Sequence, residues 1–119
     1  MAYKILAVDD GVISVRVTDL LRLADQEAVQ TLITELIEKG KKPRLLVVID
    51  HFQGWERNAK WDDVGFLVEY GDDIEKIAVV ADERWKDQAF LFAGKGFRAT
   101  EIEFFPLSAL QEVEYWVRA

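Results

Sequence analysis

Apolar and polar positions at the start of the chain follow the period of a β-strand. Residues 4–8 form a short apolar run, and residues 12–17 alternate between apolar and polar side chains. Asp10 and Gly11 lie between the two segments. Because glycine adopts positive φ at no steric cost, this pair predicts a tight turn, and the opening predicts a β-hairpin.

A helical period follows the hairpin. Between residues 25 and 39 the apolar positions have the spacing of an amphipathic helix, and they are Val29, Leu32, Ile33, Leu36 and Ile37. Gly40 and Pro43 end this pattern. Residues 44–50 then contain the run Leu-Leu-Val-Val-Ile, which is typical of a strand covered on both faces. We expect this strand to be central in the sheet.

The remaining segments continue the alternation of helix and strand. The spacing predicts helices over residues 58–70, 83–95 and 107–117, and strands over residues 74–81 and 97–105. The order is therefore ββαβαβαβα, in which the first three helices each connect two parallel strands. We predict an α/β fold with a mixed, mostly parallel five-stranded sheet, an N-terminal β-hairpin and four helices. One domain spans residues 1–119.

The charge balance restricts the partners. The sequence has 22 acidic and 15 basic residues, for a formal net charge of −7, and its Lys and Arg residues are scattered. Such a surface repels a phosphate backbone, so we expect no nucleic-acid partner. Peripheral contact with an anionic membrane would depend on apolar side chains. With no cysteine and no spanning-length apolar run, we expect a cytoplasmic protein without a metal or other cofactor.

The acidic residues at the strand ends suggest a response-regulator receiver, which the rest of the sequence does not support. The run ILAVDD, with Asp50 closing a later strand, has the arrangement of acids that hold Mg²⁺ in receivers. A receiver continues from the acidic pair into a helix, whereas Asp10 and Gly11 turn into a second strand here. The fourth and fifth predicted strands also end without the expected Ser or Thr and without the lysine.

An enzyme hypothesis would depend on His51, the only histidine, with Asp50 as its orienting group. His51 follows the end of a strand, where α/β proteins place their sites. Neighbours on an extended chain point to opposite sides, however, and the sequence has no cysteine and no Gly-flanked serine elbow. We expect no enzymatic activity, and a hydrolase using His51 and Asp50 is the least favoured function.

The middle of the chain carries a distinctive set of residues. A buried strand ends in an acid, and small residues, tryptophans and acids follow it: Gly54, Trp55, Ala59, Trp61, Asp62, Asp63, Asp73, Asp82 and Trp85. This stretch resembles the SpoIIAA-like family. The resemblance implies a STAS-type fold with likeness to the CRAL-TRIO lipid-transfer fold, and no known reaction. The anti-sigma-factor antagonist that gives the family its name carries a phosphorylatable serine at the start of the helix after the third strand. The corresponding residues 51–55 contain no Ser or Thr, so we expect no regulation by phosphorylation of a serine at this site.

Two predicted helices are apolar on too many sides for a helix that covers only a sheet. In residues 58–70, Phe66 lies nearly opposite Trp61, and in residues 83–95, Phe90 and Leu91 project away from Trp85. These side chains either pack against each other or a dimer partner, or they flank an apolar pocket or a membrane-touching lip. The candidate ligand-binding residues are Trp55, Trp61, Phe66, Trp85, Phe90 and Leu91.

Two functions follow from these alternatives. The first is a noncatalytic binding module for an apolar small molecule or lipid, with peripheral membrane contact as an option. The second is a STAS-like protein-interaction or signalling module that acts as a homodimer or docks a protein partner.

Overall fold

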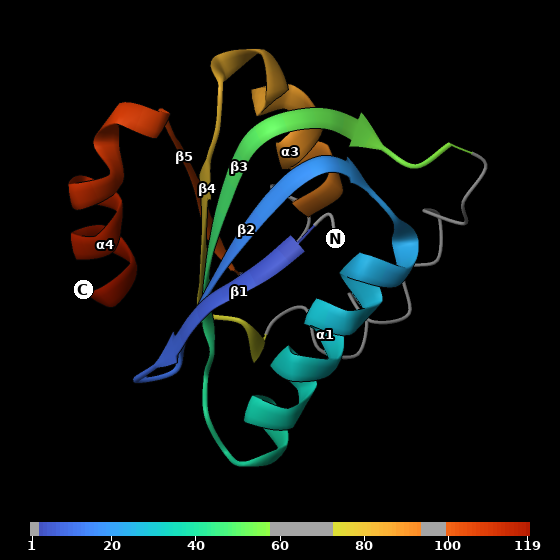
Figure 1. Cartoon of the computed structure of the whole chain (residues 1–119). Coiled ribbons are helices and arrows are strands. Elements are labelled where there is room, and N and C mark those ends of the chain that lie inside the picture. Colours follow the sequence, from blue (N-terminus) through green and yellow to red (C-terminus); the bar gives the residue numbers. More distant parts are fainter. Residues whose placement is uncertain (1–2, 58–72, 94–99) are drawn as a thin grey trace.

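The computed structural model describes residues 3–57, 73–93 and 100–119, and for residues 91–93 it describes the main chain only. Its strands form one sheet in the order of the sequence: β1 (Tyr3–Asp9), β2 (Val12–Leu21), β3 (Arg44–Trp55), β4 (Lys76–Val80) and β5 (Glu101–Phe105). The β1–β2 hairpin is antiparallel and every other pair is parallel (Figure 1). The predicted fold class and the central place of β3 are confirmed.

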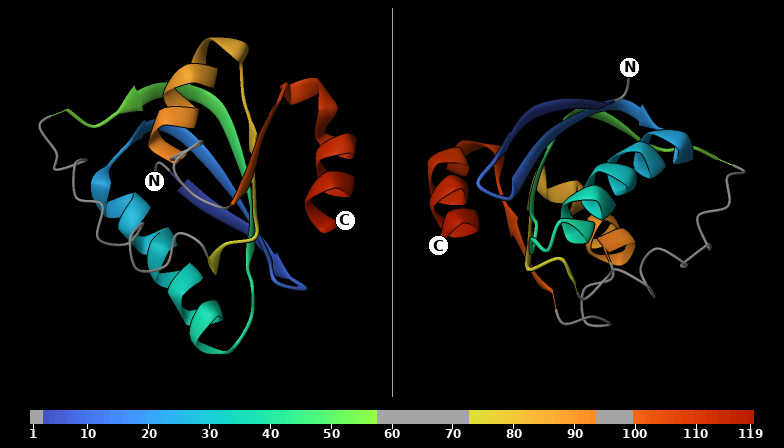
Figure 2. Two further views of the ribbon diagram at one scale, coloured as in Figure 1. Left: turned by 180° about the vertical axis from the view of Figure 1, so that it is seen from behind. Right: turned by 90° about the horizontal axis from the view of Figure 1, so that it is seen from below.

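Helices cover both faces of the sheet. On one face lie α1 (Leu23–Glu38) and α3 (Lys86–Ala93), and on the other lies α4 (Leu110–Arg118), as Figure 2 shows. The short 3₁₀ helices η2 (Glu83–Trp85) and η3 (Leu107–Ala109) lead into α3 and α4. The helix predicted over residues 58–70 lies outside the described residues, as do residues 97–99 of the last predicted strand.

Each face of the sheet has its own core because successive strand residues point to opposite sides. On the α4 face, Leu46, Ala78 and Val80 pack with Val113, and all four are buried. On the α1/α3 face, the buried residues include Ile13, Ile49, Ile77 and Ile102 from four neighbouring strands, with Ile33 and Leu36 from α1. The continuous apolar runs of β3 and β4 are explained by this two-sided burial.

The predicted ends of β2 and β3 were wrong, since both strands continue several residues further. The pairing passes from Val17↔Ile49 to Asp19↔Phe52 through an irregularity, where Asp19 and His51 adopt φ of 56° and 52°. Ile49 and Phe52 are three positions apart, so regular alternation would place them on opposite faces, yet both belong to the same core. The irregularity therefore returns Phe52 to the α1/α3 face, and both strands arch toward α1 beyond it (Figure 1).

Candidate functional site

Three aromatic rings meet where β3 ends. The Phe52 centroid lies 5.0 Å from that of Trp55 and 4.9 Å from that of Trp85, and the two tryptophan centroids are 6.0 Å apart. All three contacts are edge-to-face, an arrangement that adds to the energy of apolar burial. Phe52 is 5% exposed, whereas Trp55 and Trp85 keep part of their surface accessible. We call these three residues the aromatic cluster.

Separate segments bring the members of the aromatic cluster together. β3 supplies Phe52 and Trp55, and η2 supplies Trp85. Asp82 caps the start of η2, because its carboxylate accepts a hydrogen bond from the backbone N–H of Arg84 at 3.0 Å. Gly54, between the two aromatic residues of β3, has a φ of 112°. Residues other than glycine rarely adopt this backbone conformation. The sequence Phe-Gln-Gly-Trp is thus compatible with this turn of the strand, and Gly54 lies beneath the Trp85 ring.

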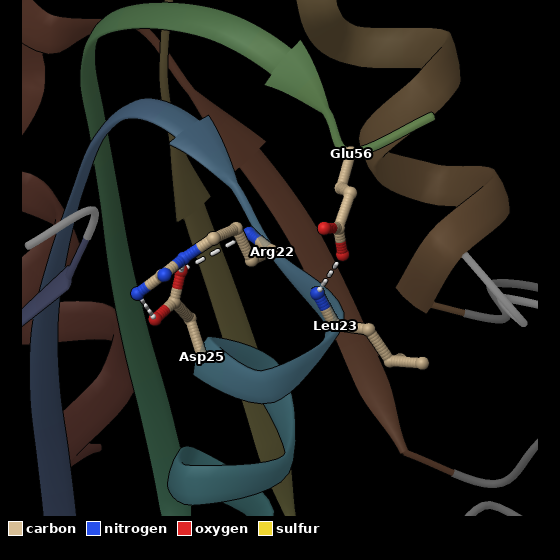
Figure 3. A network of polar contacts seen from close by, with 4 residues as sticks. All are labelled: Arg22, Leu23, Asp25 and Glu56. Atoms are coloured by element: carbon tan, nitrogen blue, oxygen red, sulfur yellow. Dashed lines mark hydrogen bonds and ion pairs between the residues drawn. The ribbon is translucent and has the colours of Figure 1, made fainter. Parts of the chain in front are cut away.

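A hydrogen bond between distant segments fixes the end of β3. Oε1 of Glu56 accepts a hydrogen bond from the backbone N–H of Leu23 at 3.1 Å (Figure 3). The backbone N–H of Glu56 donates to the carbonyl oxygen of Leu21 at 2.8 Å. The first N–H groups of a helix have no partner within the helix, so the Glu56 carboxylate satisfies one of them at α1. The position of Trp55 is therefore coupled to the start of α1.

The same helix start holds an ion pair. The Arg22 guanidinium donates from Nε to Oδ2 of Asp25 at 3.2 Å and from Nη2 to Oδ1 at 3.1 Å, and the Arg22 backbone N–H donates to Oδ2 at 3.1 Å (Figure 3). Burial opposes ionisation of Asp25, but the bonds from Arg22 outweigh it, and the pKa of Asp25 is lowered. The side-chain bond to Asp25 raises the pKa of Arg22.

The central strand keeps accessible apolar surface on both of its faces, and the part on the α1/α3 face lies beside the aromatic cluster. On the α1/α3 face Leu45 and Val47 are partly exposed and Ile49 is buried, and on the α4 face Val48 is partly exposed and Leu46 is buried. Among the described elements, α1 makes its main strand contacts with β2, and α3 makes its own with β5. The apolar surface of β3 thus lies between the two helices, and it continues into the aromatic cluster.

The structure brings some of the predicted site residues together and separates others. Trp55 and Trp85 are in contact, while Phe90 packs edge-to-face on Phe104 of β5 at 6.1 Å. Trp61, Phe66 and the side chain of Leu91 lie outside the described residues. The predicted site as a whole therefore stays a prediction.

Three further residues of this surface were missed by the sequence analysis: Phe52, Leu45 and Val47. An apolar run that is typical of a doubly buried strand gives no sign that the strand stays partly accessible. Phe52 could have been found from the aromatic spacing of Phe52 and Trp55 around Gly54.

His51 and Asp50 are closer than strand alternation predicts. Because His51 takes a left-handed conformation, its Nε2 lies 3.6 Å from Oδ1 of Asp50. The other carboxylate oxygen of Asp50 accepts a hydrogen bond from Nη2 of Arg16 at 2.5 Å, on the α4 face of the sheet. The His51 side chain is 81% exposed, so its imidazole lies in solvent. The described geometry supplies neither a nucleophile nor a shielded site for it.

A polar hollow on α1 does not fit an apolar ligand. It is open to solvent and lined by Glu27, Gln30, Thr31, Thr34, Glu35 and Glu38. None of the predicted site residues contributes to it. Across the described ranges, no group of three His, Cys, Asp or Glu side chains could hold a metal ion, and no helix is long and apolar enough to cross a membrane.

Comparisons with known proteins agree with this architecture. The sequence profile of a family described as SpoIIAA-like matches residues 12–118. Among solved structures, the chain is similar to an uncharacterized protein of the DUF3478 family with a SpoIIAA-like fold from Shewanella loihica PV-4. The two share 20% identity over 98% of this chain and 92% of the other, with a TM-score of 0.66. No curated protein matches the sequence.

Proposed function

This chain belongs to the SpoIIAA-like family, and we propose that it is a noncatalytic binding module for an apolar small molecule or lipid. The observation that carries the proposal is the apolar surface of β3 that the described elements leave partly accessible between α1 and α3. Leu45 and Val47 keep accessible surface in the middle of the sheet, where a central strand of a small domain is ordinarily closed on both faces. An acyl chain or a similar apolar group would bury that surface.

The surroundings of this surface suit an apolar ligand. The partly exposed residues that join Leu45 and Val47 in the same core are apolar, and they include Leu21, Val29, Leu32, Trp55, Trp85, Phe90 and Phe104. The aromatic cluster offers rigid rings at the end of β3, and ring contacts add to the gain from burial. Lys86 lies 5.9 Å from the Phe90 centroid and 6.0 Å from that of Phe104, so one cation borders this surface for an anionic headgroup.

Retained ligand and membrane contact give the first test. Purified full-length protein is examined by native mass spectrometry and solvent extraction for bound lipid, and by flotation with neutral liposomes. The net charge of −7 disfavours adsorption on anionic vesicles, so we expect any flotation to be insensitive to salt. A protein that purifies empty and ignores both a fluorescent fatty acid and the liposomes contradicts the proposal.

A matched pair of variants locates the site. Val47→Phe places a ring on the α1/α3 face, whereas Val48→Phe adds the same volume one residue later on the α4 face. Both valines are partly exposed, so the two changes carry comparable risk to folding. We expect Val47→Phe to weaken binding of the fluorescent fatty acid roughly tenfold, and Val48→Phe to leave it unchanged. Equal affinities in the two variants would place the ligand elsewhere.

A protein-interaction module is the second candidate function. It is favoured by apolar side chains that remain exposed on β1, of which Leu6 is 49% and Val8 is 48% exposed. A monomer that binds fatty acid separates the two candidates, because the interaction function requires a second chain.

A further inference from the structure

The free edge of β1 is suited to association with another strand. In the sheet order, β1 has β2 as its one neighbour, and no other described strand pairs with its outer side. Its seven residues contain no proline, and their charges lie near the two ends, at Lys4 and Asp9. Proteins usually protect an edge strand with a central charge, a proline, a β-bulge or a covering segment, and of these β1 has an irregularity between Ile5 and Ala7. The centre of β1 nevertheless exposes Leu6, Ala7 and Val8.

The opposite edge of the sheet is different. β5 carries Glu101 and Glu103, both exposed and two residues apart on one face of the strand. Two copies that met along β5 would place like charges near each other, which destabilises strand pairing. Of the two edges in the described sheet, β1 is therefore the one suited to a second copy of this chain.

The irregularity in β1 sets which residues share a face. Lys4 lies opposite Arg16 and Asp9 lies opposite Val12, and these two β2 positions are an even number apart. Lys4 and Asp9 therefore share a face although they are five residues apart, because the pairing shifts between Ile5 and Ala7.

The other face follows the same rule. Ile5 lies opposite Val15 and Val8 opposite Ile13, which places Ile5 and Val8 together on the α1/α3 face.

We propose that two copies of this chain associate through β1, antiparallel, with Lys4 of one copy opposite Asp9 of the other. A two-fold axis perpendicular to the sheet then passes between Leu6 and Ala7, so Ile5 also meets Val8 and the two bulges face each other. Opposite charges and apolar side chains each meet a favourable partner across the interface. The result is a continuous ten-stranded sheet.

The faces exclude a slip of one residue, and the pairing of opposite charges at Lys4 and Asp9 selects the proposed register among the others. Directly opposite residues in an antiparallel pair point to the same side of the sheet. A slip of one residue would place Lys4 opposite Val8, or Ile5 opposite Asp9, and in each case the two side chains lie on different faces. The Asp9 side chain is 63% exposed, with Nη1 of Arg118 3.6 Å from its Oδ2, which leaves it accessible to a lysine of the second copy.

Cysteine pairs test the register directly, because the natural sequence contains none. Lys4→Cys and Asp9→Cys are purified separately, and each is oxidised alone or mixed with the other. We expect disulfide-linked dimers from the mixture, with little from either variant alone, since only a residue 4 to residue 9 pair has the required separation. Equal cross-linking in all three samples would overturn the proposed register.

Charge reversal tests the association by sedimentation over a range of protein concentrations. We expect the natural chain to dimerise, and Lys4→Asp to weaken the dimer roughly tenfold because it places acids opposite acids. The double variant Lys4→Asp/Asp9→Lys should recover most of the affinity. Circular dichroism confirms that each variant is folded. A natural chain that stays monomeric throughout, or a folded double variant without recovery, would overturn the proposal.

Discussion

Glu56 and Leu23, 33 positions apart, are joined by a hydrogen bond of 3.1 Å from the Leu23 backbone N–H to the Glu56 carboxylate. This bond ties the first turn of α1 to the end of β3. The bond also helps to position Trp55, a member of the aromatic cluster, because Trp55 immediately precedes Glu56.

The first prediction concerns removal of this carboxylate. Glu56→Ala leaves the Leu23 N–H without its acceptor, and we expect a loss of about 1 kcal/mol in the free energy of unfolding. Urea denaturation monitored by circular dichroism measures the change. Glu27→Ala is the control, because Glu27 is an exposed residue of α1 and only its carbonyl oxygen accepts a hydrogen bond from a side chain, that of Thr31. A Glu56→Ala variant as stable as Glu27→Ala would show that the bond contributes nothing.

The second prediction concerns pH. In the folded chain the pKa of Asp25 is lowered, because Arg22 stabilises the ionised carboxylate more than burial opposes it. The unfolded chain binds this proton at about pH 3.9. The stabilising contribution of Asp25 is therefore fully present above that value, and it is lost as the pH falls from about 3.9 through the lowered folded pKa.

The variant Asp25→Asn isolates this contribution. At neutral pH we expect it to be less stable than the natural chain, since the ion pair with Arg22 is gone. As the pH falls through the window below about 3.9, the difference in unfolding free energy should shrink. Urea titrations at a series of pH values measure it. A difference that stays constant from neutral to acidic pH would contradict the role of Asp25.

Much of the fold could be predicted from the sequence because burial imposes its period on the residues. The run Leu-Leu-Val-Val-Ile in β3 indicated a strand covered on two sides, and β3 is indeed central. Asp10 and Gly11, both at positive φ, form the hairpin turn that their residue types favour. Such features depend on neighbouring residues only, so a local pattern is enough to predict them.

The ends of β2 and β3 could not be predicted in this way. Asp19, Asp50 and His51 interrupt the alternation, and a polar interruption after an apolar run ordinarily indicates a loop. Here the two strands stay paired through the irregularity because each satisfies the other's backbone groups. This pairing between distant segments carries Phe52 and Trp55 to the candidate site, and no local pattern contains it.

The third prediction concerns Phe52, which contacts both tryptophans of the aromatic cluster. Its ring is 5% exposed, so Phe52→Ala removes a buried side chain at the end of β3, and we expect a loss of about 3 kcal/mol in unfolding free energy. Phe52→Leu keeps most of the apolar volume and should cost about half as much. Chemical denaturation measures both.

The same two variants distinguish an energetic role of Phe52 from a positional one. Trp55 and Trp85 lie 6.0 Å apart, close enough for their rings to interact in the near-ultraviolet circular dichroism spectrum. If Phe52 holds the two rings in place, Phe52→Leu should weaken that signal although the protein remains folded, because a leucine cannot reproduce both edge-to-face contacts. A spectrum unchanged in Phe52→Leu would mean that β3 and η2 position the tryptophans without Phe52. The aromatic cluster would then be three neighbouring rings with no structural dependence among them.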